Sequence, residues 1–308
     1  MVSQTITSRS GEVYTVPLMQ EDTLEIHELW PPEGQSGDIK ADIVAVHGLG
    51  GDSFRTWTEE STKELWLRTF LHKDIENVRI MTFGYNANIL RNKAAGNTYS
   101  FAENLLAALR RKRPGEAKRR PLILLGHSLG GIVIKQALIT AKIRSPMYKD
   151  ILESTWHLMF FGTPHQGSLF APGADFLNNL GSVISGNKNR VAQELKLWSP
   201  ELLAITQDFA SIADHFSKTS FWERKETKRV TIVHQGSARL GHRNEEVIGL
   251  NENHLTICKF ASRDNASYTT VKDILIQEVL RLDEREAIVE HELRIQELAQ
   301  LVTPMRLT

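Results

Sequence analysis

Cysteine is almost absent from this sequence of 308 residues. Cys258 is the single cysteine, so the chain can form neither an internal disulfide nor a zinc site built from cysteine ligands. A lone thiol is typical of proteins in a reducing compartment. We therefore expect an intracellular protein. As separate predictions, we assign the chain no metal ion and no organic cofactor.

Long apolar runs are also lacking. No stretch reaches the roughly 20 apolar residues that a transmembrane helix needs. The first residues have neither the basic region nor the apolar region of a secretory signal. These features predict a cytoplasmic protein, with a mitochondrial location or peripheral attachment to a membrane as the alternatives.

The chain carries no net charge, because 37 lysines and arginines balance 37 aspartates and glutamates. This balance argues against a general nucleic-acid-binding protein. The one dense basic segment is Arg110 to Arg120. We interpret it as a solvated connection between a helix and a strand. The alternative is contact with an anionic lipid surface, to which each basic residue near it would contribute about 1 kcal/mol.

The most informative stretch runs from Pro121 to Ala137. Leu122 to Leu125 is a short apolar run that predicts a strand buried on both faces, and Gly131 to Ile143 has the pattern of a buried helix. Between them stands the sequence GHSLG, with Ser128 at its centre. A strand, a tight turn with serine at its apex and a helix are typical of a nucleophile elbow. The motif alone is weak evidence, so other parts of such a site must support it.

Strand and helix patterns alternate along the rest of the chain. Helices are predicted over Thr62 to Leu71 and Tyr99 to Arg111. Strands are predicted at Leu24 to Leu29, Ala41 to Val46, Val78 to Tyr85, His157 to Gly162 and Arg229 to His234. This alternation predicts an α/β fold with a mostly parallel central sheet and helices on both faces. Ligands of such folds bind at the carboxyl ends of the strands.

A second glycine-rich turn, His47 to Gly51, follows the predicted strand Ala41 to Val46. In serine hydrolases a loop at this place supplies one backbone N–H of the oxyanion hole, and the residue after the nucleophile supplies the other. We therefore assign the two donors to the amides of Leu49 and Leu129. Alone, this turn would be read as an ordinary strand end; its pairing with the elbow favours the functional interpretation.

The general base and its acid must follow the serine in the order serine, carboxylate, histidine. His254 comes after the last predicted strand and before a terminal helix, so chain order selects it from 11 histidines. Glu223 best fits the position of the acid, where the segment Ser220 to Glu223 would leave the sheet. Asp214 and Glu226 are the alternatives.

Two further segments complete the predicted organisation. Residues from Leu169 to about Ser220 are expected to form helices rich in apolar side chains, an insertion that can act as a lid. A charged helix is predicted over Asp283 to Val302. We thus expect a hydrolase domain over residues 1–282 with a lid at about 169–220. Residues 283–308 would form a C-terminal helix that packs on the body, self-associates or leads to a downstream domain.

With these parts in place, the chain resembles the α/β-hydrolase superfamily of serine esterases and lipases. More narrowly, it resembles the hydrolase domain at the N-terminus of fungal NLR-type (NACHT) receptors and the serine-active-site proteins linked to lipid remodelling. The motifs that carry the resemblance lie at Val46 to Thr58, Gly126 to Leu138, Phe160 to Ser168, Phe221 to Glu223, and Leu250 to Phe260.

The resemblance implies Ser128 as nucleophile, His254 as base and Glu223 as acid. The sequence departs from the family at Trp222, where tyrosine is more common, and at Asn253, where aspartate is more common. The second departure removes a carboxylate next to His254 and makes Glu223 more necessary. The receptor domains are thought to act as effectors, which implies downstream partners.

The sequence therefore predicts an intracellular hydrolase of carboxylic esters, lipase-like, phospholipase-like or esterase-like, that works through an acyl-enzyme. Apolar residues in the expected lid favour a phospholipid or acylglycerol over a small soluble ester. No substrate-binding residue is assigned. The alternative is a signalling or effector module that keeps the fold with little or no catalysis.

Overall fold

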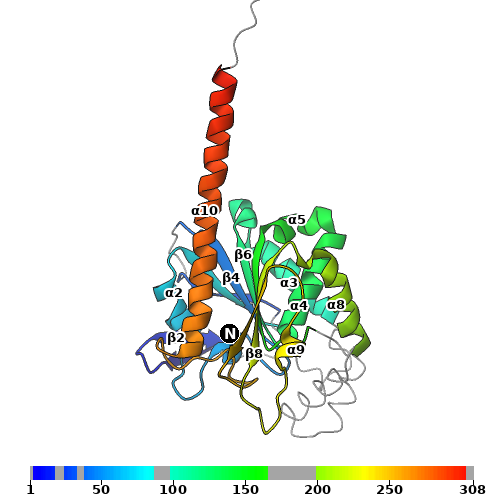
Figure 1. Cartoon of the computed structure of the whole chain (residues 1–308). Helices are drawn as coiled ribbons and strands as arrows, with labels where there is room; N and C mark the ends of the chain where they lie inside the picture. The colour runs from blue at the N-terminus through cyan, green and yellow to red at the C-terminus, as the bar shows by residue number, and fades with distance from the viewer. Residues whose placement is uncertain (1–2, 18–23, 33–37, 87–97, 166–198, 303–308) are drawn as a thin grey trace, which may run out of the picture.

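A seven-stranded sheet forms the centre of the molecule (Figure 1). The computed structural model describes residues 3–17, 24–32, 38–86, 98–165 and 199–302. The strand order is β3-β5-β4-β6-β7-β8-β9; β3 pairs antiparallel with β5, and the other pairs are parallel. The strands are β3 (Ile26–Trp30), β4 (Ala41–Val46), β5 (Val78–Phe83), β6 (Leu122–His127), β7 (Thr155–Phe161), β8 (Ser217–Glu223) and β9 (Glu245–Leu250). A separate antiparallel pair joins β1 (Ser3–Thr7) to β2 (Val13–Pro17).

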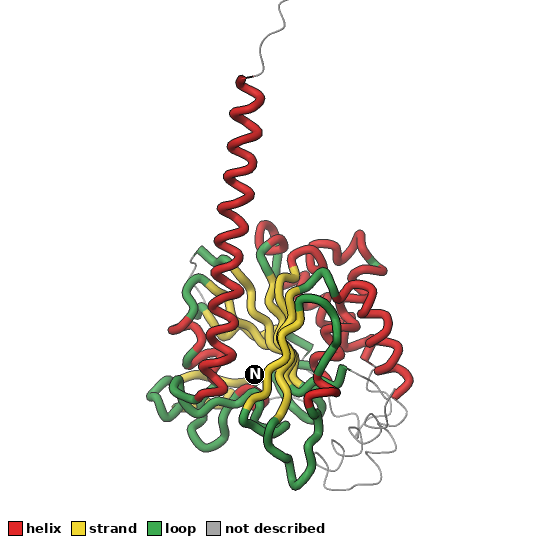
Figure 2. The backbone as a smooth tube through the Cα atoms, in the orientation of Figure 1, coloured by secondary structure: helices red, strands yellow, loops and turns green. Residues whose placement is uncertain are grey.

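Helices cover both faces of the sheet (Figure 2). One face carries α3 (Thr98–Lys112), α4 (Leu129–Ile143), α5 (Ser145–Ser154) and α8 (Ser199–Ala213). The other carries α1 (Trp66–Thr69), α2 (Leu71–Asp74) and α10 (Ala266–Val302). Shorter helical turns are η1 (Arg55–Trp57), η2 (Gly115–Arg119) and α9 (Gln235–Ala238).

Successive residues of the central strands belong to two different hydrophobic cores. In β4, Val44 and Val46 pack on the side of α3 and α4, whereas Ile43 and Ala45 pack on the side of α10. Every residue of β4 and of β6 is buried. This two-sided burial explains why both strands read as continuous apolar runs. The predicted α/β class is confirmed.

The local predictions hold best in the first half of the chain. The strand expected over Ala41 to Val46 has those bounds, and the helix after Ser128 begins at Leu129. The single helix expected over Thr62 to Leu71 is wrong, because two helices of four residues, α1 and α2, occupy this region.

The strand predicted over Arg229 to His234 is also wrong. Val230 makes only an isolated bridge with Thr227, and the buried Ile232 and Val233 pack in the core on the α4 side. Their apolar, β-branched pattern reflects this burial and not a strand. The last strand is instead β9, a half-exposed edge strand in a segment for which no strand was predicted.

The expected insertion falls into two parts. Residues 166–198 lie outside the described residues, and the prediction of a lid rests on them. In the described part, α8 packs against α4, and its Ile205 and Phe209 side chains are buried in the core. Ser217 to Ser220 already belong to β8. The described part of the insertion is therefore built into the body of the protein.

The C-terminal helix is longer than predicted. The segment Asp283 to Val302 is the second part of α10, a helix of 37 residues, so the boundary drawn at residue 282 falls inside a continuous helix. The first part of α10 buries Tyr268, Val271 and Leu275 against the sheet. Its far end extends past the amino ends of the parallel strands (Figure 1). Among the described residues, no helix combines the length and apolarity needed to cross a bilayer.

Candidate active site

Ser128 occupies a strained turn between β6 and α4. Its backbone has φ 52° and ψ −120°, which is uncommon for a residue with a side chain. The turn is held by the Ser128 amide, which donates to the carbonyl of Phe161 at 2.9 Å. Leu129 is the first residue of α4, so its amide belongs to the N-terminal turn, where the helix dipole favours negative charge.

Two glycines allow this turn to pack closely. A Cβ at Gly130 would lie 2.2 Å from the carbonyl oxygen of Val46, and one at Gly126 would lie 2.6 Å from the Cα of Gly131. Real Cβ atoms do not approach other atoms so closely, so both positions exclude side chains. The glycines of the GHSLGG motif therefore bring the end of β4 and the start of α4 against each other.

His254 lies directly beside the serine. Its Nε2 is 3.1 Å from Ser128 Oγ, and its side chain is buried. Gly162 has φ 54°, and a Cβ there would lie 3.1 Å from His254 Nδ1, so this glycine leaves room for the ring. The backbone amide of His254 donates to Thr227 Oγ1 at 3.0 Å.

Glu223 lies on the other side of the imidazole, at the end of β8. Its side chain is fully buried, and its Oε1 is 3.5 Å from His254 Nδ1. The amide of Val233 donates to the same oxygen. A carboxylate facing Nδ1 favours the tautomer with the proton on that nitrogen. Nε2 is then free of a proton and accepts the hydrogen bond of the Ser128 hydroxyl.

The structure does not place the two alternative acids, Asp214 and Glu226, beside the His254 imidazole. Asp214 precedes β8 in the chain. Its side chain is 55% exposed, and its Oδ1 lies 3.8 Å from His242 Nδ1. Glu226 is exposed to solvent. Of the three carboxylates considered from the sequence, Glu223 is the one within ion-pair distance of His254.

His127 supports the site in a way that the sequence did not reveal. Its Nε2 donates to the carbonyl oxygen of His254 at 2.9 Å. Burial, with a smaller contribution from the charge of His254, lowers the pKa of His127 to about 3. His127 is therefore neutral over the physiological range and fixes the backbone of the catalytic candidate. The two residues are far apart in the chain, so no local pattern could have indicated this contact.

The glycine-rich turn after β4 also lies beside the serine. A Cβ at Gly48 would be 2.8 Å from Ser128 Cβ. The amide of Tyr85 donates to His47 Nε2 at 3.2 Å, so Nδ1 carries the proton and donates to the Gly48 carbonyl at 2.9 Å. Burial lowers the pKa of His47, so its imidazole stays neutral. These contacts hold the turn that contains Leu49, whose amide is the predicted donor.

Comparison with known proteins gives both sequence relatives and structural neighbours. No family model matches the sequence. Over 83% of its length the chain is 27% identical to protein SERAC1 of Mus musculus, and over 82% it is 29% identical to protein SERAC1 of Bos taurus. It covers 42% and 41% of those proteins, so it spans about two fifths of the curated relatives that it matches.

Two solved structures share the architecture. The mature lipase BlEst2 of Bacillus licheniformis matches with a TM-score of 0.53 and 19% identity, over 81% of this chain and 97% of the lipase. A fungal esterase from Rhizomucor miehei matches with a TM-score of 0.53 and 11% identity, over 92% of this chain and 84% of the esterase. At these identities the likeness concerns the fold alone. The chain has an α/β-hydrolase fold.

Proposed function

We propose that this protein is a serine hydrolase that cleaves carboxylic esters, with Ser128 as nucleophile, His254 as base and Glu223 as acid. The observation that carries the proposal is the contact of 3.1 Å between His254 Nε2 and Ser128 Oγ at a strained elbow. The buried carboxylate of Glu223 behind the imidazole supports the same assignment. The distance from Glu223 Oε1 to His254 Nδ1, 3.5 Å, is longer than a typical hydrogen bond. Such hydrogen bonds are often long in active sites without substrate.

The first half of the reaction forms an acyl-enzyme. His254 takes the proton of Ser128 as Oγ attacks the ester carbonyl, and the carbonyl oxygen becomes an oxyanion. The amides of Leu49 and Leu129 stabilise that oxyanion, each by about 3 to 4 kcal/mol. Glu223 orients the imidazole and stabilises its positive charge. His254 then protonates the leaving alcohol.

The second half returns the enzyme to its starting state. Water replaces the alcohol, gives its proton to His254 and attacks the acyl carbonyl. The second tetrahedral intermediate uses the same two amides. Its collapse breaks the bond between the acyl carbon and Ser128 Oγ, and His254 returns the proton to that oxygen. The products are a carboxylic acid and an alcohol.

The substrate we propose is an ester of a long acyl chain, such as a phospholipid or an acylglycerol, with a small soluble ester as the second choice. The apolar residues that favour an acyl chain lie mainly in residues 166–198, outside the described residues. Structural neighbours that are a lipase and an esterase support this substrate class without selecting a member of it. Hydrolysis of esters graded by chain length, with and without phospholipid vesicles, would identify the preferred substrate.

A fluorophosphonate probe tests the nucleophile. The wild-type protein is expected to become labelled at Ser128, and Ser128→Ala is expected to lose the label. Failure of the wild type to react, or equal labelling of Ser128→Ala, would refute the enzymatic proposal and favour the alternative, a signalling module that keeps the fold.

Substitution of the carboxylates tests the acid. Glu223→Gln keeps the shape of the side chain and removes the charge, so we expect a fall in kcat of about 10²- to 10⁴-fold with a native circular dichroism spectrum. Glu226→Gln and Asp214→Asn are the matched controls and should stay within about twofold of wild type. A large loss in either control with little change in Glu223→Gln would reassign the acid.

Membrane contact through Arg110 to Arg120 is a further part of the proposal. Several of these cations already form ion pairs: Arg113 and Arg120 with Asp42, Lys112 with Glu28, and Lys118 with Asp150. The segment precedes β6, so it lies at the amino ends of the strands, whereas Ser128 lies at the carboxyl ends. A membrane bound there would face away from the serine.

The projecting end of α10 is the surface we propose for self-association or for the link to a downstream domain. It projects past the amino ends of the parallel strands (Figure 1). Ser128 follows the carboxyl end of β6, so a partner bound to the projecting helix would not cover the site. The effector role implied by the resemblance to NLR-type receptors stays a prediction, as does a cytoplasmic location. Size-exclusion chromatography with and without residues 287–308 would test self-association.

A further inference from the structure

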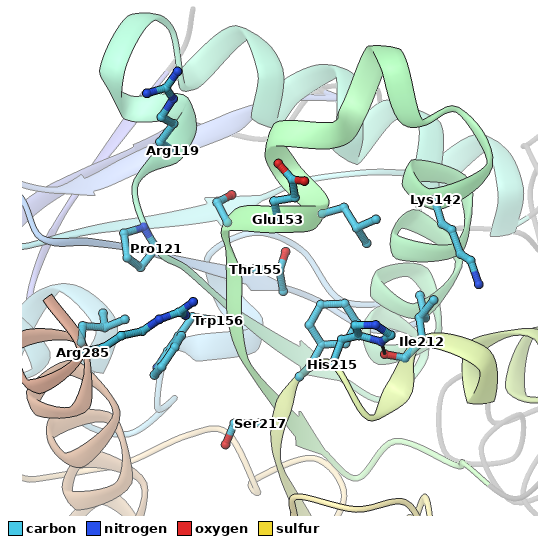
Figure 3. Close-up of a pocket in the computed structure, with 14 residues that line it drawn as sticks. Arg119, Pro121, Lys142, Glu153, Thr155, Trp156, Ile212, His215, Ser217 and Arg285 are labelled. Atoms are coloured by element: carbon cyan, nitrogen blue, oxygen red, sulfur yellow. Dashed lines mark hydrogen bonds between the residues drawn. The ribbon is translucent and has the colours of Figure 1, made fainter. Parts of the chain in front are cut away.

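A large cavity lies at the amino ends of the parallel strands, whereas Ser128 lies at their carboxyl ends. It has a volume of about 1070 Å³, at the upper end of the range typical of small-molecule sites. Pro121, Thr155 and Ser217, which stand at the starts of β6, β7 and β8, contribute to its floor. Figure 3 shows α10 on one side of the cavity and the end of α8 on the other.

This cavity is not the catalytic cleft. β7 runs from Thr155 to Phe161, and at about 3.3 Å per residue its two ends lie about 20 Å apart. Ser128 pairs with the Phe161 end, whereas the cavity lies at the Thr155 end. A molecule in the cavity therefore cannot be attacked by the serine.

The wall of the cavity is largely apolar. Three buried side chains line it, Ile212 at the end of α8, Phe216 in the turn that follows, and Leu282 of α10, together with Leu152 and Trp156. These side chains come from α5, β7, α8 with the turn after it, and α10, and they leave between them a space that the protein does not fill. Such a lining suits a flexible hydrocarbon chain.

Cations surround the same cavity. Arg119, Lys142 and Arg285 line it and are exposed to solvent, and the single acidic residue of the lining is Glu153. Glu153 lies 3.5 Å from Lys149, which offsets its charge. The lining therefore carries a net positive charge.

Two of these cations are available to a ligand. The guanidinium of Arg285 lies 5.3 Å from the centre of the Trp156 ring, which holds it at the rim (Figure 3). Within the ranges that the structure describes, neither Arg119 nor Arg285 has a carboxylate partner. Guanidinium groups suit carboxylates and phosphates, to which they can donate two parallel hydrogen bonds.

We propose that this cavity binds an anionic amphiphile, an acyl chain that ends in a carboxylate or a phosphate. The chain would lie against Trp156, Phe216 and Leu282, and the anionic group would contact Arg119 or Arg285. Because α10 supplies Leu282 and Arg285, the bound molecule would join this helix to β7 and α8. The inference does not depend on the proposed catalytic function.

Calorimetric titration of the full chain tests the proposal with four probes: decanoate, decyl phosphate, 1-decanol and acetate. Decanoate or decyl phosphate should bind with one molecule per chain, and the tighter of the two identifies the preferred head group. Decanol, which lacks the charge, and acetate, which lacks the chain, should each bind at least 10-fold more weakly. Equal affinity for decanol, or no binding of either anionic probe at millimolar concentration, would overturn the proposal.

Charge variants test whether the ligand binds in this cavity. Arg119→Gln and Arg285→Gln change exposed side chains, and we expect at least one of them to weaken binding about 10-fold, the value of one charge-assisted hydrogen bond. Arg111→Gln removes the same charge from an exposed position outside the lining and should leave affinity within twofold. Unchanged affinity in both cavity variants would assign the ligand to another site. Labelling of Ser128 should be normal in all three.

Discussion

Replacing Lys135 by methionine is expected to stabilise the protein, and to do so more at pH 6 than at pH 9.5. Lys135 lies on α4 with a fully buried side chain. Its Nζ donates to Thr206 Oγ1 at 3.0 Å. Burial disfavours the ammonium form and lowers the pKa of Lys135 from 10.5 to about 7.

The sign follows from proton binding in the two states. Between pH 7 and pH 10.5 the unfolded chain holds a proton on this lysine and the folded protein does not, so the free energy of unfolding rises with pH. The two pKa values differ by about 3.5, and at about 1.4 kcal/mol per pH unit the charged lysine costs about 5 kcal/mol below pH 7. At pH 9.5 about 1.4 kcal/mol of this cost remains.

Methionine has a similar length and no proton to bind, so Lys135→Met removes this cost. It also removes the hydrogen bond to Thr206, which is worth about 1 kcal/mol at every pH. Thr206 still donates to the carbonyl of Leu202 at 3.0 Å. The stabilisation by the variant should therefore be about 3 kcal/mol larger at pH 6 than at pH 9.5.

Urea unfolding of wild type and variant at both pH values measures this difference. Lys142→Met, which changes an exposed lysine of the same helix, is the control and should alter stability by no more than about 0.5 kcal/mol at either pH. A stabilisation by Lys135→Met that is equal at pH 6 and pH 9.5 would show that Lys135 does not lose its proton on folding, and the reasoning would fail.

Two further substitutions test the packing of the elbow and the ion pairs of Asp42, which lies near the amino end of β4. Gly130→Ala places a methyl group 2.2 Å from the Val46 carbonyl oxygen, so we expect it to cost about 1 to 3 kcal/mol of stability and to slow fluorophosphonate labelling. Gly236→Ala, whose methyl group would meet only the His234 side chain, at 3.3 Å, should cost less stability and leave the labelling rate unchanged. Asp42→Asn removes a fully buried carboxylate that contacts three arginines, and thermal unfolding should show a loss of about 3 to 5 kcal/mol. Asp150→Asn, at a half-exposed ion pair, should cost less than about 1 kcal/mol.

The sequence could predict the centre of the fold because the signals there are local. The strands β4 and β6 are buried on both faces, so burial alone makes them continuous apolar runs. The elbow needs glycine at Gly126 and Gly130, since any side chain there would collide with backbone. Residue type at these positions is therefore dictated by the backbone itself.

The later part of the sheet could not be predicted in this way. β9 is a half-exposed edge strand containing two adjacent glutamates and a glycine, so its burial leaves little pattern in the sequence. Residues 229–234 have the pattern of a strand without forming one, because Ile232 and Val233 are buried through contacts with distant parts of the chain. Tertiary contacts outweigh local preference in both segments.

By itself, the sequence determined the class of the fold, the strained turn at Ser128 and an order of residues compatible with a catalytic triad. Which carboxylate faces His254, the contact of His127 with the His254 carbonyl and the cavity beneath α10 were decided only by the tertiary structure. The physical reason is that these features join side chains from separate strands and helices. Their distances depend on how the elements pack, and no spacing along the chain records that packing.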